Sequence, residues 1–193
     1  MNIRPLQFCS QVLSFIKIEN KTLIKTHLYL RITQAMKGNE LIIERLNSRL
    51  SEELTAINQY IVHSEMCANW GYDKLHSKIE KRAIDEMKHA EKLIGRILFL
   101  EGKPMVSNLQ KITIGQDVQK QLEADLASEL DAVKVYNEDI KFAEQIGDNG
   151  TRELLESILA DEENHIDWLE AQLDQIKQMG VQFYLTMQIS SED

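Results

Sequence analysis

The chain has 193 residues, 43% of them hydrophobic and 27% charged, which is ordinary for a soluble globular protein with one good-sized core. Its net charge of -9 repels a phosphate backbone and so disfavours nucleic-acid binding. No apolar run approaches a membrane span, and the two cysteines, Cys9 and Cys67, form no CxxC motif, so we expect no membrane insertion, no disulfide framework and a cytoplasmic location.

Residues 1–35 differ in charge from the rest of the chain. They carry five Lys or Arg against one acidic residue, and polar residues interrupt their partly apolar stretch from 6 to 18. No small-residue cleavage pattern follows, which disfavours a secretory signal. A basic arm that binds a partner is one interpretation. We favour another, in which Met36 is the true start and residues 1–35 reflect an over-extended reading frame.

From Met36 onward the apolar residues recur every three or four positions, the pattern of amphipathic helices. The chain has only 8 Gly and 2 Pro, too few turn residues for many short strands. The first expected helix runs from about Asn39 to Asn69, and the second, which Asp73 can cap, stops at 102–104. The third runs from about Asp117 to 147–150. The fourth ends near Gly180, and a short fifth helix covers Phe183 to Ile189.

The connections between these helices predict an all-α fold. Two short links make the first and second helices antiparallel neighbours, and likewise the third and fourth. The long middle link allows the chain to cross the length of the bundle. This pattern predicts a ferritin-like four-helix bundle over residues 36–193, with a long crossover between the second and third helices.

The two halves of this region resemble each other at one constant offset. An offset shared by both helices of a pair predicts two helical hairpins related by an approximate two-fold axis. The matching polar or aromatic pairs are Glu53 with Glu129, Tyr60 with Tyr136, Asp85 with Asp161, Glu86 with Glu162, and His89 with His165.

Each predicted hairpin carries two Glu residues whose sequence midpoint falls at its turn, so all four helices direct a carboxylate at one level of the interior. Buried carboxylates are costly unless they are paired or bind a metal, and each His lies three residues after a Glu on the same helix face. Carboxylate with imidazole favours iron, manganese or zinc. Taken singly, each Glu would usually face solvent and each His satisfy a local hydrogen bond. The expected metal ligands are Glu53, Glu86, His89, Glu129, Glu162 and His165.

At these residues the sequence resembles the bacterioferritin family. The resemblance spans 36–189 and includes 53–60 (ELTAINQY), 84–90 (IDEMKHA), 96–102 (RILFLEG) and 161–170 (DEENHIDWLE). It implies a homo-oligomeric shell of twenty-four subunits that stores ferric mineral. It also implies that the six ligands form a di-iron ferroxidase centre, with Glu86 and Glu162 bridging the irons, and that oxygen or peroxide oxidises Fe(II) there.

The resemblance assigns two further residues. Met87 is turned roughly 100° from its neighbour Glu86 around the helix, toward a flank of the bundle. In the family the Met of this motif ligates haem b across a two-fold interface; plain interface packing is the alternative. Haem would aid iron release, with a ferredoxin-type protein as a candidate electron donor. Tyr60 would lie beside the centre, either as an electron donor or as a core tyrosine with a satisfied hydroxyl.

One position departs from the family pattern. Some members carry a His one turn before the second-helix motif, with an accessory iron role at the cavity wall. Here that position is Lys81, although Asp85 remains. This departure puts an inner-surface iron site in doubt.

Three rival functions share this bundle. A rubrerythrin-like peroxidase would normally bring a Cys-rich iron domain, which two isolated cysteines cannot build. A haem-binding electron-transfer protein would keep Met87 without loading the di-iron site, and the full set of six ligands argues against it. A DNA-protecting mini-ferritin would place its ligands between subunits, and the full ligand set within one bundle here disfavours it.

Overall fold

The computed structural model describes residues 37–190, and the expectations for residues 1–35, Cys9 included, lie outside this range. The predicted all-α architecture is confirmed. Within the described range, no helix combines the length and apolar character needed to cross a bilayer. The helices are α2 (Glu40–Asn69), α3 (Asp73–Phe99), α4 (Val118–Gln145), α5 (Asn149–Met179) and α6 (Val181–Thr186).

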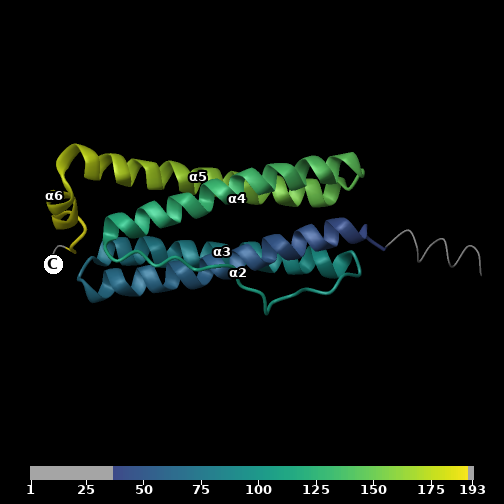
Figure 1. The fold of residues 1–193 in the computed structure, drawn as a ribbon, viewed down its shortest axis with the longest axis horizontal. Helices are drawn as coiled ribbons and strands as arrows, with labels where there is room; N and C mark the ends of the chain where they lie inside the picture. Colours follow the sequence, from purple (N-terminus) through teal and green to yellow (C-terminus); the bar gives the residue numbers. More distant parts are fainter. Residues whose placement is uncertain (1–36, 191–193) are drawn as a thin grey trace, which may run out of the picture. The chain divides into compact units, whose positions relative to one another are not determined.

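The four long helices form two antiparallel hairpins that pack together as one bundle. Helix α2 packs along α3, α4 packs along α5, and α2 also contacts α4 (Figure 1). Residues 100–117 form the long crossover that returns the chain along the outside of the bundle to the start of α4. The short and long connections expected from the sequence are both present.

The helix ends follow turn chemistry, with one correction. The Asn39 side chain caps α2 by accepting from the backbone N–H of Leu41 at 2.9 Å. Gly71 ends the turn after α2 with a φ of 80°, a conformation that favours glycine. Asp73 was expected to cap α3, but Tyr72 is the N-cap residue and makes no side-chain capping bond. Asp73 is instead the first helical residue, where its charge complements the helix dipole.

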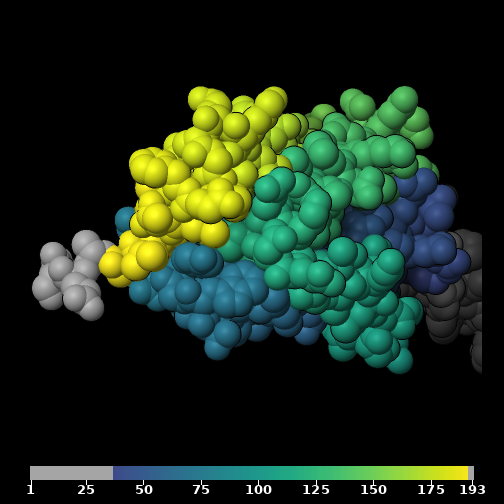
Figure 2. Space-filling model, turned by 60° about the vertical axis from the view of Figure 1, so that its left-hand side comes forward, coloured from purple at the N-terminus to yellow at the C-terminus, as the bar shows by residue number. Residues whose placement is uncertain are grey.

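The short fifth helix begins earlier than expected. Gly180 adopts a φ of 82°, and α6 begins at the very next residue rather than at Phe183. The buried Tyr184 donates from its hydroxyl to the Gln172 side chain at 3.0 Å, which fastens α6 to α5. The space-filling view shows these yellow C-terminal residues against the blue start of α3 (Figure 2), where the Lys74 N–H donates to the Gln188 carbonyl.

The apolar core is divided into two clusters rather than running unbroken along the bundle. One cluster includes Leu46 and Leu50, which precede Glu53 on α2. The other includes Tyr60 and Cys67, which follow it. The level between the clusters is where the buried charged side chains of the four helices lie. The two apolar clusters therefore lie on either side of a polar layer. This layer cannot stabilise the bundle by burying apolar surface.

The crossover is tied to the bundle by a buried polar network. His63 on α2 lies 2.9 Å from an Asp125 carboxylate oxygen, and its Nε2 accepts the Gly115 N–H at 3.1 Å. Gln59 donates to Asp125 at 2.8 Å and accepts the Thr113 N–H at 3.0 Å. A Cβ at Gly115 would lie 2.2 Å from a backbone nitrogen of α4, so only glycine allows this close approach.

Candidate metal centre

The structure brings all six expected ligands to one level of the bundle interior. All are buried, and the most exposed of them, His165, retains only 8% of its accessible surface. Their ligand atoms form two groups, each with all atoms within 4.8 Å of one another. The groups are Glu53, Glu86, His89 and Glu162, and Glu86, Glu129 and His165.

The two histidines point their Nδ1 atoms at the carboxylates. His89 Nδ1 lies 3.0 Å from Glu86, 3.1 Å from Glu162 and 3.5 Å from Glu53. His165 Nδ1 lies 2.7 Å from Glu129. Because all these donor atoms converge in a buried site, they are suited to replacing the hydration of a divalent transition-metal ion.

Neighbouring side chains orient the imidazole rings. Asp161 places a carboxylate oxygen 3.1 Å from His89 Nε2, the arrangement that commonly orients a metal-binding histidine. The ring of His165 stacks on Trp168 at a centroid distance of 5.9 Å and meets the edge of the Tyr60 ring at 5.6 Å. The roles of Asp161 and Trp168 were not predicted, although both lie in the 161–170 motif.

A tyrosine hydroxyl supports a glutamate from each hairpin. Tyr60 donates to Glu129, and Tyr136 donates to Glu53. Burial, followed by the nearby carboxylate charge, raises the pKa of both phenols well above the usual value, so both remain donors at neutral pH. Tyr60 was expected beside the centre, but Tyr136 was missed, although the repeat pairs it with Tyr60.

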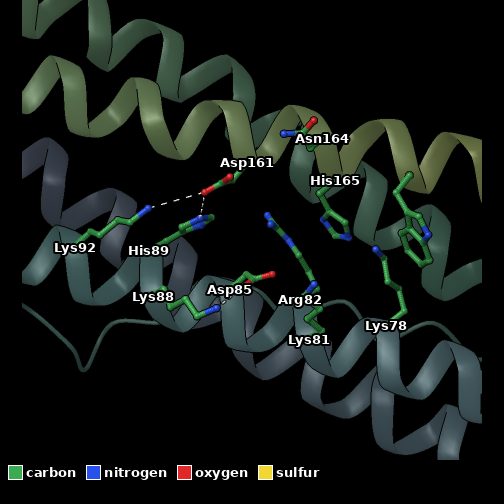
Figure 3. A pocket seen from close by; sticks show the side chains of 11 residues that line it. Lys78, Lys81, Arg82, Asp85, Lys88, His89, Lys92, Asp161, Asn164 and His165 are labelled. Atoms are coloured by element: carbon green, nitrogen blue, oxygen red, sulfur yellow. Dashed lines mark hydrogen bonds and ion pairs between the residues drawn. The ribbon is translucent and has the colours of Figure 1, made fainter.

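Arg82 is the main site residue that sequence reasoning missed. Its side chain is 8% exposed, and its Nη2 lies 2.6 Å from Glu86, 3.5 Å from Glu129 and in direct contact with Glu162. The close-up shows its guanidinium reaching up between His89 and His165 (Figure 3). Its position one helical turn before Glu86 was the available signal, because residues four apart share a helix face.

Protons and Arg82 balance the carboxylate charge in the metal-free cluster. Burial, then the charges of Glu86 and Glu129, raises the pKa of Glu162 to about 8, and burial with the charge of Glu53 raises the pKa of Glu86. Burial opposes ionisation of Glu129 too, but its hydrogen bond with His165 and the charge of Arg82 lower that pKa to about 2.

His89 carries positive charge in the same cluster. Burial disfavours the charged ring, yet the carboxylates of Glu162, Glu53 and Glu86 outweigh it and raise the pKa of His89 to about 12. A cation that binds here therefore replaces protons held by the chain, which is the usual coupling between metal binding and proton release.

Two pockets of opposite character flank the centre. The pocket between α3 and α5 has a volume of about 300 Å³ and is lined by Lys78, Lys81, Lys88 and Lys92 together with Arg82 (Figure 3). In it, the Asp85 carboxylate already pairs with Lys88 at 2.7 Å. This pairing and the nearby Lys81 both disfavour an accessory iron site at Asp85.

The second pocket, of about 340 Å³, opens beside α2 and α4. Acidic side chains outnumber basic ones in its wall, and they include Glu52, Glu53, Glu129 and Asp131. Such a wall attracts cations and offers them a route to the buried carboxylates.

Met87 lies on an exposed flank of α3, turned away from the buried glutamate cluster. Its side chain is 50% exposed, and Ile84, three residues earlier on the same helix face, is 43% exposed. An accessible thioether beside an exposed aliphatic side chain fits the edge of a haem, whose iron accepts sulfur and whose ring needs apolar cover.

Comparisons with known proteins agree with the helical architecture. Residues 43–179 match the model of the family described as Ferritin-like domain. The chain is 45% identical over 149 residues to a bacterioferritin of Brucella melitensis, covering 77% of this chain and 92% of the relative. It is 41% identical to a bacterioferritin of Rhodobacter capsulatus (82% and 98% covered) and 41% identical to one of Mycobacterium tuberculosis (80% and 98% covered).

Proposed function

Because this chain belongs to the bacterioferritin family of ferritin-like proteins, we propose that it stores iron by oxidising Fe(II) at its buried carboxylate–histidine cluster. In this proposal Glu53, Glu86, His89, Glu129, Glu162 and His165 bind two Fe(II) ions as a di-iron centre. Oxygen or peroxide takes one electron from each, and the Fe(III) product is deposited as mineral.

One observation carries the proposal: two of the carboxylates already present their two oxygens to different partners. Glu86 directs Oε2 at His89 and Oε1 at Arg82. Glu162 directs Oε1 at His89 and Oε2 at Arg82. A carboxylate held in this way can bind one ion with each oxygen, so Glu86 and Glu162 are suited to bridge a pair of ions. Holding two ions on common ligands is what favours oxidation by a two-electron acceptor.

The surrounding side chains prepare the centre without binding iron. Tyr60 and Tyr136 hold Glu129 and Glu53 by hydrogen bonds, which limits their rotation. Burial raises the pKa of both Glu86 and Glu162, so any protons that they hold would leave when the ions bind. We assign Tyr60 a second role, as the electron donor beside the site, because its ring packs edge-on against His165 with the two ring centroids 5.6 Å apart.

Assembly and haem binding complete the proposal. Residues 36–193 would form the ferritin-like subunit of a shell of twenty-four identical chains in the cytoplasm. Met87 would ligate haem b from the exposed flank of α3, paired with the same residue of a second subunit. The haem would supply electrons for iron release, taken from a ferredoxin-type donor.

The decisive test is Fe(II) oxidation by Glu86→Ala, measured by the appearance of ferric absorbance after metal depletion. We expect loss of the fast phase while gel filtration still shows an assembled protein. Glu91→Ala, an exposed glutamate of the same helix, serves as the matched control and should oxidise Fe(II) normally. Unchanged fast oxidation by the Glu86 variant would reject the centre as the site of reaction.

A further inference from the structure

A side chain of the protein already holds a cation position within the carboxylate cluster. The Arg82 Nη2 lies between carboxylates of three helices, 2.6 Å from Glu86, 3.5 Å from Glu129 and in contact with Glu162. A metal ion bound by the same oxygens could not share this space, because cations at such distances repel strongly.

The contacts identify which of the two ion positions is held. The group formed by Glu86, Glu129 and His165 defines one position, and Arg82 contacts the oxygen Oε1 of both its glutamates. The other position is built around His89, whose Nδ1 faces the remaining oxygens of Glu86 and Glu162. The guanidinium thus stands in the position on the His165 side of the cluster.

The internal repeat shows that this cation breaks the symmetry of the bundle. The residue that matches Arg82 in the second hairpin is Ile158, which is 0% exposed and belongs to the apolar core. The ligands of the two ion positions come from repeated sequence. Among residues 37–190, however, an arginine is inserted only into the Glu86–Glu129–His165 position.

The guanidinium is incompletely bonded where it lies. Its Nε is buried and has no hydrogen-bond partner among residues 37–190. The pocket of about 300 Å³ between α3 and α5 adjoins it, and its wall includes Asp85, one turn further along α3. The side chain therefore has both room and an acidic acceptor on the pocket side, since the Asp85–Lys88 pair joins a half-buried carboxylate to an exposed lysine and is easily exchanged.

From these contacts we propose that Arg82 is a tethered cation that holds the Glu86–Glu129–His165 position until a metal ion displaces it into the lysine-lined pocket. The inference rests on the proposed function, because it concerns loading of the same centre. One ion enters the His89 position with Arg82 in place, and the second must exchange with the guanidinium. The two positions consequently differ in affinity, although their ligands are related by the repeat.

The test is an anaerobic titration of the metal-free full chain with Co(II), which binds such ligands without being oxidised by the centre. Wild-type protein should show two steps with a clearly weaker second step. In Arg82→Gln the second step should tighten by at least about tenfold. Lys81→Gln, which removes the same charge from the same pocket one residue away, should match wild type. A second step that is unchanged or weaker in Arg82→Gln overturns the proposal.

A second measurement avoids dependence on the folding of the variant. A crystal structure of wild-type protein loaded with two Zn(II) ions should show the Arg82 guanidinium in the pocket, away from Glu86 and Glu129. Retention of either contact beside two bound ions overturns the proposal.

The Co(II) titration also separates this proposal from the proposed function. Equal Co(II) binding by wild type, Arg82→Gln and Lys81→Gln rejects the tethered cation alone, whereas failure of all three proteins to bind Co(II) rejects the metal centre as well.

Discussion

The hydroxyl of Tyr60 donates a hydrogen bond to the carboxylate of Glu129, which joins α2 to α4 across the centre of the bundle. The counterpart bond runs from Tyr136 on α4 to Glu53 on α2. Each hairpin therefore supports the glutamate of the other hairpin, and the two bonds hold the halves together at the level where the buried charges meet. The support of the candidate ligands is thus itself two-fold symmetric.

This symmetry makes the two tyrosines matched controls for each other. Tyr60→Phe and Tyr136→Phe each remove one donor from a buried carboxylate, so each should lower the free energy of unfolding of the metal-free protein by about 1–3 kcal/mol, measured by urea denaturation. Both variants should also slow Fe(II) oxidation in a single turnover, because each loosens a ligand glutamate, and Tyr60→Phe should slow it more, because Tyr60 also lies against His165. Equal oxidation rates in the two variants would leave Tyr60 a purely structural role.

The metal-free protein should lose stability as the pH rises. The pKa of Glu162 is about 8 in the fold against an ordinary value of 4.5, and that of His89 is about 12 against 6.5. The folded state therefore keeps protons that the unfolded chain releases, and the free energy of unfolding falls from about pH 4.5 upward, by up to about 1.4 kcal/mol per pH unit for each retained proton.

Thermal unfolding with a chelator at pH 5.5 and pH 8 measures this effect. Added Zn(II) should abolish the fall, because bound cations take the place of the protons. Glu162→Gln, which is neutral at every pH, should show a shallower dependence than wild type. The lowered pKa of Glu129, about 2, acts only as the pH falls below 4.5 and does not contribute in this range. If the stability of the metal-free protein did not change between pH 5.5 and pH 8, the raised pKa values of Glu162 and His89 would be contradicted.

Replacement of Met87 tests the haem site. Met87→Leu keeps the apolar volume on the exposed flank of α3 but removes the thioether, so we expect the haem absorption bands to disappear from the purified protein. Fe(II) oxidation should be spared, because Met87 lies outside the buried cluster. Met105→Leu, another exposed methionine, should retain haem. Haem bands that survive in the Met87 variant would assign the axial ligand to another residue.

The network beneath the crossover should be important for stability. Asp125 is 1% exposed, and His63→Leu removes a partner that lies 2.9 Å from its carboxylate. We expect a loss of about 3 kcal/mol or more in the free energy of unfolding, since a buried charge would be left short of partners. The double variant His63→Leu with Asp125→Asn should recover part of the lost free energy of unfolding. A loss below about 1 kcal/mol would show that the network contributes little.

Much of the fold was predictable because its signals are local. The apolar spacing along each helix and the glycines at the turns indicated where helices run and end. The errors are local as well: Asp73 is not a cap, since the backbone at Tyr72 enters the helix without a side-chain bond, and α6 begins at Val181 because Gly180 turns the chain at once. Neither shift moves a residue of the candidate centre.

The sequence by itself determined which six side chains meet, because helix phase and the pairing of antiparallel neighbours follow from residue spacing, and the repeat applies the same geometry twice. Only the tertiary structure decided how the hairpins reach across to each other. The Tyr60–Glu129 bond, the His63–Asp125 pair and the insertion of Arg82 join residues of different helices. Their geometry is set by the packing of two apolar clusters around a charged layer, and no spacing along the chain encodes that packing.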